Sequence, residues 1–113
     1  MKAKGENMKI LAVTSCPVGV AHTYMSAAAL EKSAKKTGNE IKVETQGSLG
    51  FRNKLSAKDI KESDVLILAC DVACLEKERF KNIPTIEVTT KKCIKNPVAI
   101  IEQAISKIGV ENE

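Results

Sequence analysis

Four short segments of the chain carry the apolar or alternating pattern of β-strands. Residues 8–15 and 64–69 are nearly continuous apolar runs, as expected for strands that are buried on both faces of a sheet. Residues 40–45 alternate between apolar and polar positions, and residues 83–88 form a fourth candidate strand that contains Pro84. Because proline cannot donate a hydrogen bond to a neighbouring strand, we expect this fourth strand at an edge of the sheet and residues 64–69 near its centre.

Helical patterns separate these strands. Residues 22–37 place small apolar side chains on one side and charged side chains on the other, and Gly38 follows where a left-handed residue ends a helix. Ser56 and Asp59 have the spacing of a capping box, which predicts a short helix at that point. Pro97, which follows an asparagine, predicts the first turn of a final helix.

The alternation of strands and helices predicts an α/β fold. We expect three layers, with a four-stranded parallel sheet covered by helices on both faces. Residues 46–53 contain two glycines and are expected to form a loop, and residues 1–7 are expected to be a flexible leader to a single domain of residues 8–113. In such folds ligands bind where the strands end, at the carboxyl edge of the sheet.

Composition narrows the functional classes. Aromatic residues make up 3% of the 113 residues and tryptophan is absent, which argues against the stacking platforms of single-strand nucleic-acid binders. The net charge of +4 is spread along the chain and favours acidic or phosphate-bearing partners without naming one. No run reaches the length of a membrane-spanning helix and the first residues lack a signal-peptide core, so we expect a cytoplasmic protein.

Four cysteines offer candidate chemistry: Cys16, Cys70, Cys74 and Cys93. In a cytoplasmic chain these are expected to be thiols rather than disulfides. The chain has no pair of cysteines at zinc-site spacing, and His22 is its single histidine, so we expect neither a metal nor another cofactor.

Cys16 stands out because of the stretch LAVTSCPVGVAHTYM around it. It lies where the first strand ends and the first helix begins, and free amides at a helix N-terminus stabilise an anion. A thiol in this position is expected to have a lowered pKa and to be nucleophilic. Pro17 fixes the backbone beside it, and Gly19 allows the loop to curl. The alternative is that Cys16 is a small apolar residue at the end of a buried strand, and His22 could either hold the loop or carry a proton.

Cysteine phosphatases use a related loop of the form C-x5-R, in which the arginine clamps the phosphate. Here the position six residues after Cys16 is His22, and the loop contains no arginine. Loss of such a clamp weakens stabilisation of the hydrolytic transition state. The loop therefore favours receiving and retaining a phosphoryl group over hydrolysing it.

The segment CPVGVAHTYMSAAALEKSAKKTG resembles the enzyme IIB component, fructose type, of the phosphoenolpyruvate-dependent sugar phosphotransferase system. That family carries C-P-T-G-x-A-H-T after its first strand, and Val18 is the departure from this motif. The segments KVETQGSLG and DVLILACDVACLEKERFKNIPTIEV also resemble the family, so the likeness spans roughly residues 8–108.

The resemblance implies that Cys16 accepts a phosphoryl group from a phosphohistidine of a IIA partner. It would pass the group to a sugar, fructose by family likeness, that is bound by a membrane IIC partner, and the chain would act at the inner face of the membrane. The expected phosphoryl-binding loop comprises Pro17, Val18, Gly19, Val20, Ala21, His22 and Thr23, and the expected neighbouring rim residues are Gln46, Gly47 and Asp71.

The residues alone also allow two other functional interpretations. The first is a small cysteine phosphatase or arsenate reductase on a similar fold, with Cys70 and Cys74 as a relay pair. The second is a non-catalytic module that binds an anion at the same rim. The sequence also leaves open a mannose-type or other hexose as the sugar, because the choice of sugar is expected to reside mainly in the membrane component.

Overall fold

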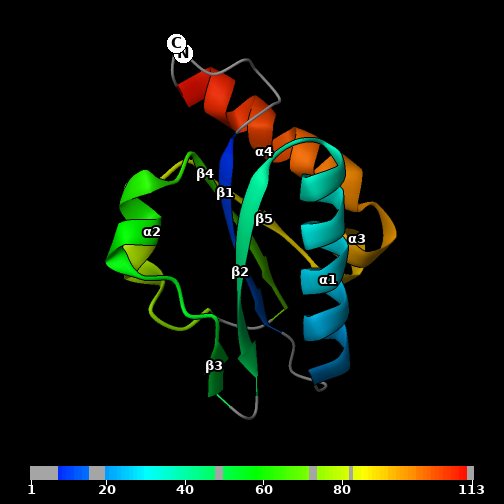
Figure 1. Ribbon diagram of the computed structural model, residues 1–113. Helices are drawn as coiled ribbons and strands as arrows, with labels where there is room; N and C mark the ends of the chain where they lie inside the picture. Colours follow the sequence, from blue (N-terminus) through cyan, green and yellow to red (C-terminus); the bar gives the residue numbers. More distant parts are fainter. Residues whose placement is uncertain (1–7, 16–19, 48–49, 72–73, 82, 112–113) are drawn as a thin grey trace.

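The computed structural model describes residues 8–15, 20–47, 50–71, 74–81 and 83–111, with the side chains of residues 20–22, 47 and 108–111 outside that description. A five-stranded mixed sheet forms the middle layer, in the order β3-β2-β1-β4-β5 (Figure 1). Strands β1, β2, β4 and β5 are parallel, and β3 pairs antiparallel to β2. The strands are β1 (Lys9–Ser15), β2 (Glu40–Gly47), β3 (Gly50–Arg52), β4 (Val65–Cys70) and β5 (Thr85–Val88).

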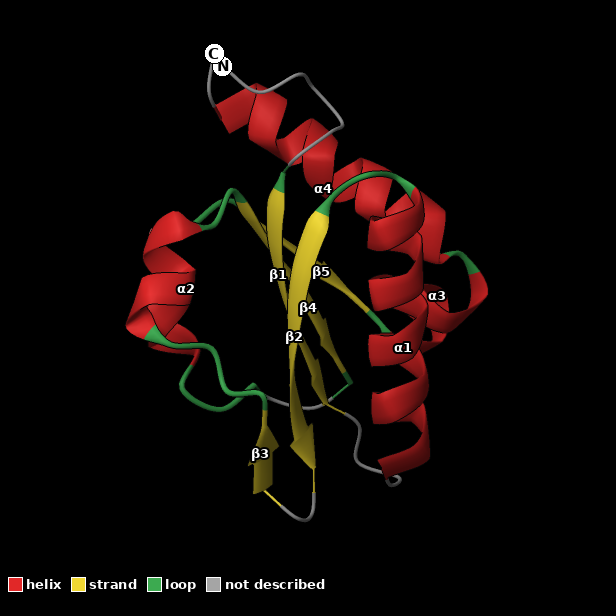
Figure 2. Cartoon of the chain, viewed as in Figure 1, coloured by secondary structure: helices red, strands yellow, loops and turns green. Residues whose placement is uncertain are grey.

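Helices cover both faces of the sheet, as predicted (Figure 2). The helices α1, α3 and α4 lie on one face, whereas α2 lies on the other. The helical elements are α1 (Val20–Lys36), α2 (Ala57–Glu62), the 3-10 turn η1 (Lys77–Phe80), α3 (Thr90–Lys95) and α4 (Pro97–Glu111).

The side chains of β1 alternate between two cores, so apolar groups must be buried on both faces of the sheet. Ile10 and Ala12 pack into the core beneath α1, α3 and α4, whereas Leu11 and Val13 pack into a second, smaller core with Leu55, on the side of α2. All of these β1 side chains are at most 1% exposed. The continuous apolar run of the first strand therefore has the physical cause that the sequence suggested, which is burial on two sides.

The expectation of a purely parallel four-stranded sheet is wrong in one respect. Residues 46–53 do not form a simple loop, because Gln46 and Gly47 end β2 and Gly50–Arg52 form β3. Gly47 pairs with Gly50 in the antiparallel ladder, and Gly50 has a φ of +99°, which favours glycine. The two glycines therefore lie in paired strands rather than in a loop.

The positions of the other strands agree with the sequence. β5 is an edge strand, and β4 lies inside the sheet between β1 and β5, although β1 occupies the central position. The short helix α3 is an element that the pattern does not predict. Its six residues are too few to show a helical period, and its first turn is capped by the Thr89 side chain, which accepts a hydrogen bond from the amide of Lys92.

The predicted helix ends are confirmed at two points. Gly38 follows α1 with a φ of +79°. At the start of α2, the Ser56 hydroxyl accepts a hydrogen bond from the amide of Asp59 at 3.1 Å, and the Asp59 carboxylate accepts one from the amide of Ser56 at 2.9 Å. The capping box is therefore complete, and it begins a helix of only six residues that buries none of its side chains.

We predict that Ser56→Ala lowers the free energy of unfolding by about 1 kcal/mol, because the amide of Asp59 loses its partner. Urea unfolding monitored by circular dichroism measures this change. The matched control is Ser106→Ala on the exposed side of α4. An equal effect of the two substitutions would contradict a specific role of the capping box.

Candidate functional site

The site expected from the sequence lies at the carboxyl end of β1, the central strand. Ser15, its last residue, pairs with Gln46 of β2 on one side and with Cys70 of β4 on the other. Gln46 and Cys70 therefore flank Ser15 at this end of the sheet, although both belong to the strands rather than to the loops after them. Cys16, Pro17, Val18 and Gly19 lie outside the described residues, as do the side chains of Val20, Ala21 and His22.

The first turn of α1 is tied to β1. The Thr14 hydroxyl donates a hydrogen bond to the carbonyl of Thr23 at 3.2 Å, and the Ser26 hydroxyl donates to the same carbonyl at 3.0 Å. The first turn of α1 contains no acidic residue, so no carboxylate competes for its free amides. The chain thus reaches the start of α1 from a fixed strand end, across residues 16–19.

Two buried hydroxyl groups near this turn have no hydrogen-bond partner in the described part of the chain. They belong to Thr23, which is 1% exposed, and to Thr45, which is 5% exposed and pairs with Thr14 in the sheet register. Thr23 was expected to take part in phosphoryl binding, whereas no pattern in the sequence pointed to Thr45. Unpartnered buried hydroxyls are costly, and they are therefore typical of sites where a polar group is expected.

Gln46 was expected at the rim, and its side chain is engaged within the protein. Its carbonyl oxygen accepts a hydrogen bond from the amide of Leu75 at 2.9 Å, and its NH2 group donates to the carbonyl of Leu75 at 3.1 Å. The same NH2 group donates to Glu44 at 2.8 Å and lies 3.7 Å from the sulfur of Cys74. Gln46 therefore attaches the segment after β4 to β2 as a neighbouring strand would.

Glu44 carries a buried negative charge next to Gln46. Its side chain is fully buried and pairs with the guanidinium of Arg79 at 2.9 and 3.0 Å. The amide of Leu55 donates to the same carboxylate at 2.9 Å. Burial raises the pKa of Glu44, but the hydrogen bonds from Arg79, Gln46 and Leu55 outweigh burial and leave the pKa below its ordinary value.

Sequence reasoning missed this pair as a structural unit. Glu40, Lys42, Glu44 and Gln46 are the polar positions of an alternating strand, and such positions usually face solvent. The burial of Glu44 depends on Arg79, which lies 35 residues away in the sequence. No local signal could have indicated the contact.

Asp71 joins the end of β4 to both β1 and α3. Its amide donates to the carbonyl of Ser15 at 2.8 Å. Its carboxylate accepts hydrogen bonds from the amide of Thr90 at 3.0 Å and from the Thr90 hydroxyl at 2.6 Å. Asp71, which the sequence analysis expected at the rim, therefore fixes the start of α3 next to the last residue of β1.

The three described cysteines are not activated thiols. Burial raises the pKa of Cys70 and of Cys93 to about 12, and it also raises the pKa of Cys74. Cys93 is fully buried in the core beneath α1, α3 and α4. Within the described ranges, no group of three or more histidine, cysteine, aspartate or glutamate side chains is placed to hold a metal ion.

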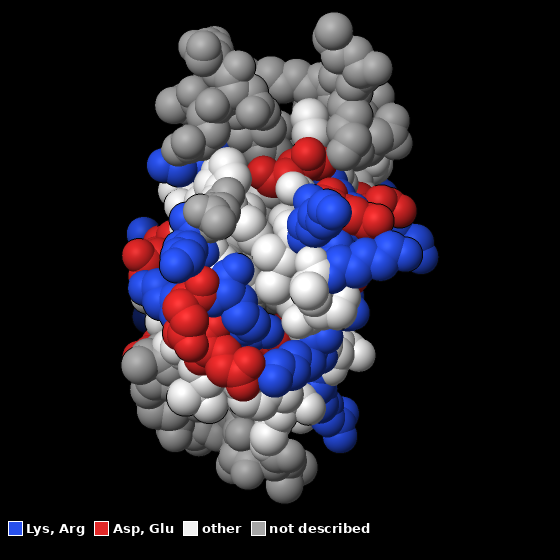
Figure 3. Space-filling model, turned by 90° about the vertical axis from the view of Figure 1, so that its left-hand side faces the viewer, with Lys and Arg blue, Asp and Glu red and all other residues white. Residues whose placement is uncertain are grey.

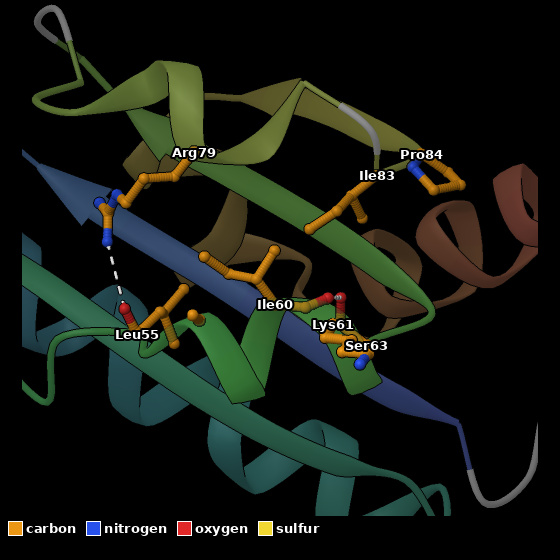
Figure 4. A pocket seen from close by; sticks show the side chains of 8 residues that line it. Leu55, Ile60, Lys61, Ser63, Arg79, Ile83 and Pro84 are labelled. Atoms are coloured by element: carbon orange, nitrogen blue, oxygen red, sulfur yellow. Dashed lines mark hydrogen bonds between the residues drawn. The ribbon is translucent and has the colours of Figure 1, made fainter.

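A hollow of about 570 Å³ lies between α2 and the segment that leads into β5 (Figure 4). Leu55, Ile60 and Ile83 give it an apolar floor. Arg79 lies at one end, where it donates to the carbonyl of Leu55 at 3.4 Å, and its charge is already met by Glu44. This hollow is on the face opposite α1, so it does not adjoin the N-terminus of that helix (Figure 1).

Comparison with known proteins agrees with this geometry. A protein-family model described as "PTS system, Lactose/Cellobiose specific IIB subunit" matches residues 11–103. The chain belongs to the IIB family of the phosphotransferase system. It is 47% identical, over 84% of this chain and 90% of the relative, to the Escherichia coli K12 protein named "PTS system fructose-like EIIB component 2".

Two further relatives are part of longer proteins. The chain is 46% identical to a part of the "PTS system fructose-specific EIIABC component" of Bacillus subtilis, over 88% of this chain and 15% of that protein. A crystal structure of a domain from the fructose-specific IIABC component of Borrelia burgdorferi has a TM-score of 0.84 and 46% identity, covering 89% of this chain and 96% of that domain. Among the described residues of the IIB chain, no helix is both long and apolar enough to cross a membrane.

We predict that Glu44→Gln lowers the free energy of unfolding by about 3 kcal/mol, because it removes the buried carboxylate that neutralises Arg79 and leaves the guanidinium with the longer, partly exposed contact to Glu76 at 3.8 Å. Urea unfolding measures the change. The control is Glu87→Gln, which breaks the exposed pair with Lys77 and should cost less than about 0.5 kcal/mol.

The same prediction has a pH dependence. Because the pKa of Glu44 is lowered in the folded protein, its contribution is present above the ordinary glutamate pKa and is lost as the pH falls through the lowered value. The stability difference between wild type and Glu44→Gln should therefore shrink in acid. A difference that is independent of pH would contradict the role of the charge.

Proposed function

We propose that this IIB chain accepts a phosphoryl group on Cys16 from a phosphohistidine of a IIA partner. It then passes the group to a sugar held by a membrane IIC partner, so that uptake is coupled to phosphorylation. The chain would act in the cytoplasm, at the inner face of the membrane when it meets IIC. The names of its relatives, which include a fructose-like EIIB component and a fructose-specific EIIABC component, support this assignment.

One observation carries the proposal. Ser15, which directly precedes Cys16, ends the central strand between two parallel neighbours that leave it on opposite sides. The crevice at the carboxyl ends of such strands is where open α/β sheets bind ligands. Cys16 therefore follows the point of the fold that is best suited to an anion, ahead of the free amides of α1.

The chemistry requires two balanced transfers. In the first, the Cys16 thiolate forms a sulfur–phosphorus bond as the nitrogen–phosphorus bond of the donor phosphohistidine breaks, and the imidazole leaves neutral after taking a proton. In the second, a sugar hydroxyl forms an oxygen–phosphorus bond as the sulfur–phosphorus bond breaks, and the hydroxyl proton is released. The thiolate is regenerated.

The proposed phosphoryl-binding loop is residues 17–23. Its main-chain amides would take up the phosphoryl oxygens, so the threonine that the family motif has at the position of Val18 is not essential to binding. The buried, unpartnered hydroxyl of Thr23 supports a place for this residue beside the bound group. For His22 we propose the role of holding the loop, and we propose that Gln46, Gly47 and Asp71 frame it from the rim.

Fructose is the proposed sugar. Relatives named as fructose-like or fructose-specific support it, although the description of the matching family model names lactose and cellobiose. Members of one family thus act with different sugars. We place sugar selection mainly in the IIC partner, because that partner holds the sugar.

We predict that incubation with a IIA protein phosphorylated on histidine adds one phosphoryl group to the chain and that Cys16→Ser abolishes a transferable label. Intact-protein mass spectrometry and peptide mapping measure the addition and its position. Cys70→Ser and Cys74→Ser are matched controls at the rim, and both should still accept the group. Transfer at a normal rate in Cys16→Ser would contradict the assignment.

The lifetime of the phosphoryl label on the same protein distinguishes a phosphoryl carrier from a phosphatase. Without IIC and sugar, the label should persist for much longer than one transfer takes, because the loop lacks an arginine clamp. Rapid release of inorganic phosphate, or steady turnover of para-nitrophenyl phosphate, would favour a cysteine phosphatase.

We predict that iodoacetamide alkylates Cys16 before the other cysteines, with a midpoint below the reference thiol pKa of about 8.5. Burial raises the pKa of Cys70, Cys74 and Cys93, so these thiols should react slowly at neutral pH. Alkylation rates at a series of pH values, resolved by peptide, measure the order. A midpoint for Cys16 at or above the reference would show an ordinary thiol.

A further inference from the structure

Two buried side-chain oxygens lack a hydrogen-bond partner in the part of the chain that the structure describes, and both lie near the carboxyl end of the sheet. They are the hydroxyls of Thr23, in the first turn of α1, and of Thr45, near the end of β2. Buried polar groups are almost always paired in native proteins, so an unpartnered hydroxyl calls for an explanation. Thr23 has one in the proposed phosphoryl-binding loop, whereas Thr45 lies outside that loop.

The sheet register directs Thr45 toward α1. Thr45 pairs with Thr14 of β1, and side chains alternate between the two faces of a strand. Val43, two residues before Thr45, packs into the core beneath α1, so Thr45 faces the same way. The hydroxyl of Thr14 donates to the carbonyl of Thr23 at 3.2 Å, which holds the first turn of α1 against this pair of strands. Thr45 therefore lies beside the start of α1.

The neighbours of Thr45 on β2 face the opposite way and hold this end of the strand. Glu44 pairs with Arg79 at 2.9 Å, and Gln46 exchanges two hydrogen bonds with the main chain of Leu75. The strand is therefore fixed on the side of α2, while the hydroxyl of Thr45 has no contact of its own on the side of α1. A rigid support of this kind suits a group that must meet a ligand at a set position.

Carboxylates around this end of the molecule are already engaged within the protein. Asp71 accepts two hydrogen bonds from Thr90, and the first turn of α1 contains no acidic residue. On the face of α2, acidic and basic side chains lie next to one another (Figure 3), and Asp59 pairs with Lys42 at 2.7 Å. The described part of the chain thus supplies Thr45 with no acceptor.

Hydrogen-bond donors converge beside the end of β2. The first amides of α1 are free, and the hydroxyls of Thr23 and Thr45 can each donate one hydrogen. Donors at a helix N-terminus favour an anion whose atoms only accept, and phosphoryl oxygens are of this kind. A buried water molecule is the other group that could meet the two hydroxyls, but it would not use the charge stabilisation that the helix end offers.

We propose that the Thr45 hydroxyl donates a hydrogen bond to an oxygen of the phosphoryl group at the start of α1, beside the hydroxyl of Thr23. Thr45 is thus a phosphate-binding residue outside the loop of residues 17–23. This inference rests on the proposed function, which supplies the phosphoryl group. Because the hydroxyl has no partner in the free protein, its hydrogen bond is gained entirely when the group is bound.

The first experiment measures phosphoryl transfer to the full chain from a purified IIA protein that is phosphorylated on histidine. Thr45→Val keeps the shape of the side chain and removes its hydroxyl, so it should lower kcat about tenfold and leave the KM for the donor unchanged. Thr45→Ser keeps the hydroxyl and should retain most of the wild-type kcat. Equal kcat values for wild type and Thr45→Val would overturn the inference while leaving the proposed function intact.

Thermal unfolding of the free protein distinguishes a ligand-binding hydroxyl from a structural one. Thr45→Val removes a buried hydroxyl without a partner, so the melting temperature should stay the same or rise. The matched control is Thr85→Val, which loses the hydrogen bond from its hydroxyl to the carbonyl of Ile83 at 2.8 Å and should melt at a lower temperature with kcat unchanged. A decrease in Thr45→Val as large as in this control would indicate a structural hydroxyl, for example one held by a buried water, and would overturn the inference.

Inorganic phosphate tests the role of Thr45 without the donor. Phosphate should raise the melting temperature of wild type and of Thr85→Val, and Thr45→Val should need about tenfold more phosphate for the same rise. If the wild-type chain takes up no phosphoryl group but shows this difference, the proposed function fails and the phosphate-binding role of Thr45 stands. If it accepts the group but does not respond to free phosphate, the comparison of kcat values decides. A wild-type chain that does neither would overturn both proposals.

Discussion

The carboxylate of Glu44 is buried, and its charge must be neutralised within the protein. The position of the chain segments at the carboxyl end of the sheet depends on the residue that does this. Arg79 supplies two parallel hydrogen bonds, and it also donates to the carbonyl of Glu76 at 2.9 Å. One guanidinium therefore neutralises a buried charge on β2 and fixes the chain before η1. Such a pair contributes little net stability over apolar packing, but it is strongly directional. Its benefit here is position, since Leu75 is held at a fixed place beside β1.

The sequence predicted those elements of the fold that depend on contacts between residues close together in the chain. The apolar run at residues 8–15, the capping box at Ser56 and the left-handed Gly38 each report a short-range requirement, and each lies where the sequence indicates. β3 and α3 were missed for the opposite reason. β3 has only three residues and forms by pairing with β2, and α3 is fixed by the contact of Thr90 with Asp71, 19 residues away.

The candidate site, too, could be predicted from the sequence only in part. A cysteine between a strand and a helix is visible in the sequence, and the parallel topology brings Gln46 and Asp71 to the same edge without further information. What the sequence could not show is that Gln46 is fully engaged with Glu44 and Leu75. The strand alternation made Glu44 look like a solvent-facing residue. Long-range partners decide the role of a polar side chain, and a single sequence contains no signal of them.

The two edges of the sheet have a consequence for the behaviour of the protein at high concentration. An unpaired strand edge can recruit the edge of another chain, and long, flat, apolar edges aggregate. Here β3 offers three residues that end in the charged Arg52, and β5 offers four residues that follow Pro84 and include the exposed Glu87. Short, charged edges of this kind disfavour growth of the sheet from one molecule to the next.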